Sequence, residues 1–225
     1  MVVGVVTVGD ELLNGTTENT NATWLAKQLT QRGATVRRIV VVPDVRSEIQ
    51  SIVRKMSERW DAVLLTGGLG PTHDDVTMAA LADAFERDLQ VHPEAEQYFQ
   101  RETDYDLEDL LEGTTSLPAG ADFLPNPAGV APGARIENVY VLPGVPEEMK
   151  AMFELIAPEF DGPQSKTAVI TTDCPESDLV DVLSAAAERF DVRIGSYPND
   201  VLTIRITGKD EAVVEAAQAW LDAHL

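Results

Sequence analysis

The chain has 225 residues, a hydrophobic share of 44% and a formal net charge of -21. This length and composition fit one sound core with a small second domain, and they argue against disorder. The charge argues against nucleic-acid binding, since no basic stripe is present to neutralise phosphates. The acidic residues are dispersed rather than blocky, which favours solvation in high salt and a halophilic source.

Secretion and membrane insertion have no support in the sequence. Cys174 is the single cysteine, so no internal disulfide is expected. No apolar stretch approaches the ~20 residues that span a bilayer, and residues 1–8 lack the pattern of a signal peptide. We therefore expect a soluble cytoplasmic protein.

The first part of the chain alternates strand and helix patterns. The run from Val2 to Val8 is almost entirely apolar, as in a strand buried on both faces of a parallel sheet. A helix follows, capped by Asn19 or Thr20 and ended at Gly33. The next predicted elements are a strand at 35–42 and a helix at 45–58 with a capping box from Ser47 to Gln50. A strand at 62–66 and a helix at 76–87 come after them. Repeated βα units with short connections predict a parallel sheet with right-handed crossovers.

The remaining pattern is weaker and then changes. A helix is predicted from Pro93 to about Thr103, an acidic and faintly periodic segment covers 104–113, and the Pro/Gly-rich stretch 126–133 is predicted as loop. A strand at 138–142 leads into a helix that contains Met149 and Ile156, and 161–163 is a linker. After the linker, the pattern predicts a strand at 167–171, a helix at 176–189, strands at 192–196 and 201–207, and a helix at 211–223. We therefore expect domains at 1–160 and 161–225, the second a ferredoxin-like α+β lobe.

The segment 66–77, Thr-Gly-Gly-Leu-Gly-Pro-Thr-His-Asp-Asp-Val-Thr, follows a predicted strand and precedes a predicted helix. Ligands of open α/β sheets bind at that end of the strands. The glycines allow backbone N–H groups to approach a phosphate, and the adjacent Asp74 and Asp75 could hold a divalent metal. The alternative is a tight turn without ligand in which one aspartate caps the helix. Neither a P-loop nor a Rossmann fingerprint is present.

Two further strand ends carry loops of similar character. Residues 9–15, Gly-Asp-Glu-Leu-Leu-Asn-Gly, follow the first strand, and Pro143-Gly144-Val145-Pro146 follows the strand at 138–142. Asp10 is a candidate metal ligand or nucleophile-orienting group, and Glu11 a weaker one; a plain surface acid is the alternative for both. The turn at 143–146 either donates backbone N–H groups to a ligand or only redirects the chain. His73 is either a general base or an exposed loop histidine.

These three loops, with Asn19-Thr20-Asn21 and Asn126-Pro127-Ala128-Gly129, resemble the molybdopterin-binding (MoCF biosynthesis, MogA/MoaB-like) domain family. Within that family the sequence is most similar to the N-terminal part of competence/damage-inducible CinA proteins, over roughly residues 1–158. The resemblance implies an α/β fold, a three-layer α/β/α sandwich with a mostly parallel sheet, in agreement with the pattern above. The sequence ends at Leu225 without a counterpart of the C-terminal nicotinamide-nucleotide amidase domain of CinA, so that activity is not expected.

Two activities follow from the resemblance. Family members that build molybdenum cofactor bind molybdopterin and adenylylate it with Mg-ATP, and CinA-type domains cleave ADP-ribose to AMP and ribose 5-phosphate with potassium and a divalent ion such as cobalt or magnesium. Asp10 and Asp75 match the aspartates that the molybdenum-cofactor members use, and they are the predicted catalytic and metal-binding residues here. The other implied ligand-binding residues are Gly9, Glu11, Asn14, Asn19, Asn21, Thr66, Gly67, Gly68, Gly70, Pro71, Thr72, Asp74, Asn126, Pro143 and Gly144. Asn19 has capping of its helix as an alternative role.

Three functions remain open at this point. The first is an ADP-ribose pyrophosphatase, the second is a molybdopterin-binding or adenylylating protein, and the third is a non-catalytic nucleotide sensor. All three use the same pocket and a small-molecule nucleotide or pterin ligand. The resemblance also implies a homo-oligomer, a dimer or trimer, and the acidic surface predicts that it loosens when salt is removed.

Overall fold

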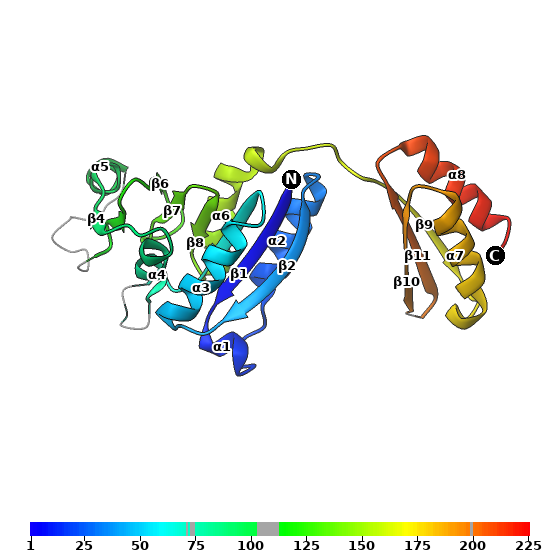
Figure 1. Cartoon of the computed structure of the whole chain (residues 1–225), viewed down its shortest axis with the longest axis horizontal. Coiled ribbons are helices and arrows are strands. Elements are labelled where there is room, and N and C mark those ends of the chain that lie inside the picture. The colour runs from blue at the N-terminus through cyan, green and yellow to red at the C-terminus, as the bar shows by residue number, and fades with distance from the viewer. Residues whose placement is uncertain (71, 73–74, 103–112, 199) are drawn as a thin grey trace. The chain divides into compact units, whose positions relative to one another are not determined.

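A computed structural model describes residues 1–70, 72, 75–102, 113–198 and 200–225. The chain divides into two compact units, Met1–Gly162 and Pro163–Leu225 (Figure 1). The division falls inside the predicted linker at 161–163. Each unit has its own hydrophobic core, so each is described by itself.

The first unit is built on a six-stranded sheet in the order β2-β1-β3-β8-β7-β6. Its strands are β1 (Val2–Val8), β2 (Thr35–Val42), β3 (Ala62–Thr66), β6 (Asp122–Leu124), β7 (Gly133–Ile136) and β8 (Val139–Leu142). The pairs β1/β2, β1/β3 and β3/β8 are parallel, whereas β7 and β6 add antiparallel at one side. The carboxyl ends of β1, β2, β3 and β8 therefore share one edge of the sheet.

Helices cover both faces of this sheet (Figure 1). One face packs against α3 (Arg46–Ser57) and α4 (Thr77–Ala84), and the other against α2 (Thr20–Gln31), α6 (Pro146–Ile156) and the 3-10 helix η2 (Ala157–Phe160). The unit also contains α1 (Asp10–Leu13), α5 (Pro93–Glu102) and a two-stranded sheet of β4 (Leu89–Val91) and β5 (Ser116–Pro118). The expected three-layer α/β/α sandwich is confirmed.

Local sequence explains most of the boundaries. Asn19 caps α2 by accepting a hydrogen bond from the N–H of Ala22 at 3.1 Å, and Gly33 has a left-handed φ of 87° just past the helix, both as predicted. The predicted capping box was wrong, because α3 already begins at Arg46 and its N-cap residue Val45 has no side chain that could accept. Helix α4 ends at Ala84 rather than near residue 87, since Glu86 takes a left-handed φ of 55°.

The second unit has the predicted β-α-β-β-α order. Strands β9 (Lys166–Thr172), β10 (Arg193–Pro198) and β11 (Leu202–Gly208) form an antiparallel sheet in the order β10-β11-β9. Helices α7 (Val180–Arg189) and α8 (Glu211–Asp222) pack against the sheet through one apolar cluster, and the 3-10 helix η3 (Glu176–Leu179) takes up the first turn of the predicted helix 176–189. Within the part of the chain that the structure describes, no helix is long and apolar enough to cross a membrane.

Candidate functional site

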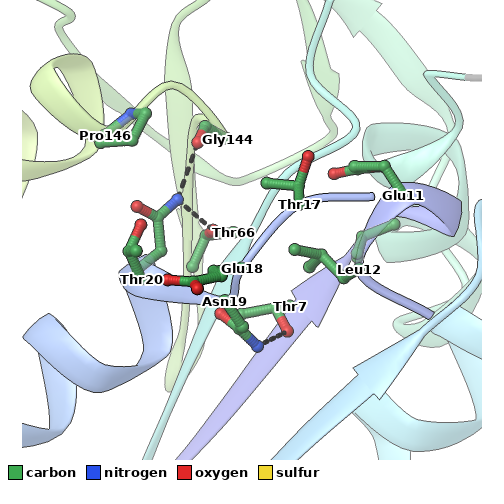
Figure 2. Close-up of a pocket in the computed structure, with 12 residues that line it drawn as sticks. Thr7, Glu11, Leu12, Thr17, Glu18, Asn19, Thr20, Thr66, Gly144 and Pro146 are labelled. Carbon is green, nitrogen blue, oxygen red and sulfur yellow. Dashed lines mark hydrogen bonds between the residues drawn. The ribbon is translucent and has the colours of Figure 1, made fainter. Parts of the chain in front are cut away.

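A pocket lies where the carboxyl ends of β1, β3 and β8 meet (Figure 2). Its cavity volume is about 100 Å³. Residues at the strand ends, in α1, in the connection from α1 to α2, and in the first turns of α2 and α6 line it, namely Thr7, Val8, Glu11, Leu12, Thr17, Glu18, Asn19, Thr20, Asn21, Thr66, Gly144 and Pro146. The pocket is therefore at the edge of the sheet where the sequence predicted a ligand.

The glycine loop after β3 passes too close to its neighbours for any side chain. Gly67 has a φ of 103°, and a Cβ there would lie 2.3 Å from the carbonyl oxygen of Val8 on β1. Gly68 has a φ of 65°, and its Cβ would lie 2.3 Å from Oγ1 of the buried Thr77 at the start of α4. Both positions need glycine, because the backbone is left-handed and the space is occupied. The loop thus holds β1, β3 and α4 together behind the pocket.

Asp75 forms part of the same loop. Its Oδ2 accepts hydrogen bonds from the N–H of Thr72 at 2.9 Å and from the Thr72 hydroxyl at 2.5 Å. A Cβ on Gly70 would lie 2.6 Å from that oxygen, so this glycine makes room for the carboxylate. Asp75 does not cap α4, whose N-cap residue is Val76 and has no side-chain hydrogen bond. The carboxylate is thus held by the loop itself.

Asp10 and a residue that the sequence analysis missed meet at the neighbouring strand end. Asp10 is exposed in the first turn of α1, and its N–H donates to Oδ2 of Asp44 at 3.0 Å. The other oxygen of Asp44 is 3.5 Å from the position of a Cβ on Gly68. Asp44 therefore links the ends of β1 and β2 and lies close to the loop that follows β3. Its place directly after β2 was the available signal, although the sequence did not reveal that β2 neighbours β1.

The three asparagines have different surroundings. Asn19 lines the pocket but uses both side-chain groups within the protein, since its amide also donates to Oγ1 of Thr7 at 2.8 Å. Asn21 donates to the carbonyl of Gly144 at 2.7 Å, while its own Oδ1 is buried without a hydrogen-bond partner. Asn14 lies outside the pocket lining and closes a local turn by accepting from the N–H of Thr16. Asn21 is thus the asparagine with an acceptor still available.

The remaining predicted positions divide between the pocket and its surroundings. Gly144 lines the pocket, and Pro143 precedes it in the turn that leads to α6. Asn126 is buried and does not line the pocket. Its amide nitrogen donates to Glu148 at 2.7 Å and to the carbonyl of Ala131 at 2.9 Å, so it anchors its loop to α6. Gly9 joins β1 to α1. Pro71, His73 and Asp74 lie outside the described residues.

The charge of the pocket is unusual for a site that binds phosphates. Glu11 and Glu18 line it, and no lysine or arginine is among the described lining residues. The N-terminal turns of α2 and α6, represented by Thr20, Asn21 and Pro146, contribute partial positive charge to it. Within the described ranges no cluster of three or more histidine, cysteine or acidic side chains is placed to hold a metal. A ligand in this pocket would therefore contact backbone dipoles, amides and acids.

This fold belongs to a known class. Residues 4–162 match the family described as "Probable molybdopterin binding domain", and the chain is a member of that family. Residues 164–225 match a second family, described as "FAD synthase, middle domain". The sequence resemblance to the molybdopterin-binding family is confirmed.

Particular relatives extend over the whole chain. A protein of Archaeoglobus fulgidus is 38% identical over 215 residues, which cover 95% of this chain and 93% of that protein. A protein of Pyrococcus abyssi is 39% identical over 246 aligned positions, which cover 100% of this chain and 97% of that protein.

Solved structures match the first unit. The crystal structure of "the protein CinA with unknown function" from Thermoplasma acidophilum has a TM-score of 0.65 and 35% identity, and it covers 71% of this chain and 97% of that chain. A molybdopterin biosynthesis protein from Mycobacterium abscessus has a TM-score of 0.50 and 22% identity over 71% of this chain and 90% of its own, which supports the fold alone.

Proposed function

We propose that the chain is a metal-dependent pyrophosphatase that cleaves ADP-ribose to AMP and ribose 5-phosphate. The observation that carries the proposal is the pocket itself, in which two helix N-termini and two glutamates meet and the lining residues that the structure describes include no basic side chain. Helix N-termini favour an anionic group, whereas Glu11 and Glu18 repel it. A diphosphate would therefore bind together with cations that neutralise it.

The candidate ligands of the divalent ion are Asp10 and Asp75. Asp10 is in the first turn of α1, after β1, and Asp75 is in the loop after the neighbouring strand β3; neither is among the described residues that line the pocket. Mg²⁺ is commonly held by one or two carboxylates together with substrate phosphates and water, so the two aspartates would supply the protein part of such a donor set. The metal would supply charge neutralisation of the diphosphate and a lowered pKa of a bound water. Potassium is a further candidate cation.

The reaction would be an in-line hydrolysis. The oxygen of a water molecule forms a bond to one phosphorus of the diphosphate, the bond from that phosphorus to the bridging oxygen breaks, and the water loses a proton. The bridging oxygen leaves with the other phosphate. Here the helix N-termini would face the diphosphate, Asn21 Oδ1 would accept a hydrogen bond from a ribose hydroxyl, and the Gly67–Gly68 backbone would fix the distance between β1 and α4.

The test is release of AMP from ADP-ribose in molar KCl with Mg²⁺ or Co²⁺, followed by chromatography. We expect AMP from the wild type and none from Asp75→Ala or Asp10→Asn. Asp88→Asn, which removes an exposed carboxylate outside the site, is the matched control and should retain activity. FAD belongs in the same assay, because it joins an adenylate to its second half through a diphosphate and the second unit matches a domain of FAD synthase. No AMP from ADP-ribose with folded protein would refute the proposal, whether or not FAD is cleaved.

A molybdopterin-binding or adenylylating protein is the second candidate, and the family description of residues 4–162 favours it. It predicts tight binding of molybdopterin and consumption of ATP in its presence, with no AMP formed from ADP-ribose. Calorimetric titration with each ligand separates the candidates. ADP-ribose that binds but is not cleaved would instead indicate a nucleotide sensor.

A further inference from the structure

Strand β9 of the second unit has an open edge. It is an outer strand of the sheet, because β11 pairs with one side of it and no described backbone group bonds to the other. Six of its seven residues, 167–172, are uncharged and five of these are threonine, valine or isoleucine. Val169 points away from the helices and is 48% exposed. Such an edge is a template for pairing with another strand.

The other long edges of the described sheets are protected. Strand β2 carries Arg37 and Arg38 at an irregularity of its register, and β10 carries Arg193 and ends in Pro198. Strand β6 has only three residues and contains Asp122. Charge, bulges, proline and short length are the usual devices that prevent edge pairing. Between Thr167 and Thr172, β9 has none of them.

We propose that β9 pairs antiparallel with β9 of a second copy of this chain, around a two-fold axis at Val169. This register places Val169 opposite its equivalent, Thr167 opposite Thr171 and Ala168 opposite Ile170 of the second copy. A two-fold contact needs a surface that complements itself. Here Val169 faces Val169 and Thr167 faces Thr171, which are β-branched pairs, Ala168 faces the apolar Ile170, and no like charges face each other. The two three-stranded sheets become one six-stranded sheet.

Charge explains why two copies would meet at β9 rather than at another part of the surface. A chain with a net charge of -21 repels its copies over most of its surface, and the uncharged strip of β9 avoids that repulsion. Lys166 at its end already forms an ion pair with Glu211 at 2.9 Å. Arg205 of β11 lies opposite Val169 of β9, so in the dimer the two copies of Arg205 would be three strand spacings apart, about 14 Å. This separation exceeds the screening length in molar salt, so the two arginines would not repel each other strongly.

The test uses the full chain in molar KCl and is independent of the proposed enzymatic activity. Sedimentation equilibrium should show a dimer that dissociates on dilution. In a Cys174→Ser background, Val169→Cys should form a covalent dimer under mild oxidation at least about tenfold faster than Thr203→Cys, which places a thiol on the same face one strand further in. Thr167→Cys mixed with Thr171→Cys should cross-link faster than either variant alone.

Two results would overturn the proposal. One is a wild-type chain that stays monomeric at every concentration in molar KCl. The other is a dimer in which Val169→Cys links no faster than Thr203→Cys, which would place the contact on another surface or with another kind of partner.

Discussion

Tyr140 of β8 should make the first unit less stable as the pH rises above 10. Its side chain is 5% exposed, and its hydroxyl donates to Oε2 of Glu159 at 2.8 Å, an oxygen that also accepts from Arg135 at 2.8 Å. Burial, followed by the hydrogen bond to Glu159, raises the pKa of Tyr140 from 10.0 to about 12. The folded state therefore retains the phenolic proton over a range in which the unfolded chain has lost it.

The sign and size of the effect follow from this difference. Because the folded pKa is the higher one, the contribution is complete below pH 10 and is lost as the pH rises toward 12. At pH 11 the unfolded tyrosine is about nine-tenths ionised and the folded one about one-tenth, which lowers the free energy of unfolding by about 1.4 kcal/mol. The complete loss above pH 12 is about 2.7 kcal/mol.

Tyr140→Phe removes the titration and gives the measurement. Urea unfolding in molar KCl, followed by the fluorescence of Trp24 and Trp60 in a Trp220→Phe background, reports on the first unit. At pH 8 the variant should be less stable by about 1.5 kcal/mol, the usual value of a hydrogen bond to a charged group. That difference should fall by about 1.4 kcal/mol at pH 11. A difference that stays constant between pH 8 and 11 would refute the reasoning.

Three further predictions concern packing, the glycine loop and a surface ion pair. Gly67→Ala should lower the free energy of unfolding in urea by about 3 kcal/mol and weaken ligand binding. Gly120 has a φ of 80° and no atom within 4 Å of the Cβ position, so Gly120→Ala should lower it by only about 1 kcal/mol. Equal losses would contradict the close approach of Gly67 to Val8. Phe153→Ala, in the core between the sheet and α2, should cost 3–5 kcal/mol, roughly, by the same assay, and a loss below about 1 kcal/mol would show that the core collapses around the gap. Arg46 lowers the pKa of Asp83 through a hydrogen-bonded ion pair, but both groups are exposed. Arg46→Ala should therefore lower the free energy of unfolding by less than about 1 kcal/mol above pH 5, and should not change it once acid protonates Asp83. NMR titration of the Asp83 carboxyl can follow that protonation.

The long elements could be predicted because their patterns are strong. The runs at Val2–Val8, Thr35–Val42 and Ala62–Thr66 match β1, β2 and β3 residue for residue. Strands of three residues have no detectable period, so β4, β5 and β6 were missed. Strand β7 was missed because it begins at Gly133, inside the predicted loop, and its turn into β8 uses Glu137 with a φ of 51° rather than glycine.

The site was predictable as an edge of the sheet but not as a set of contacts. Each loop could be placed at the end of its own strand, and Asn21, Thr66 and Gly144 do meet there. Asp44 and Glu18 were missed, because their proximity depends on which strands are neighbours, and sequence periodicity does not contain that order. Asn126 shares the family motif, yet in this structure its amide is used to hold its own loop.

The pocket also determines how its ligand can be found. Asn21 and Gly144, which it joins, are 123 residues apart, so no short fragment can form it and it exists only after the long-range contacts of the first unit have closed. A compound that binds there must stabilise the whole unit, by about 2.7 kcal/mol at a concentration one hundred times its Kd. Thermal melting of the protein with a panel of nucleotides and pterins therefore reports the ligand even when no reaction follows.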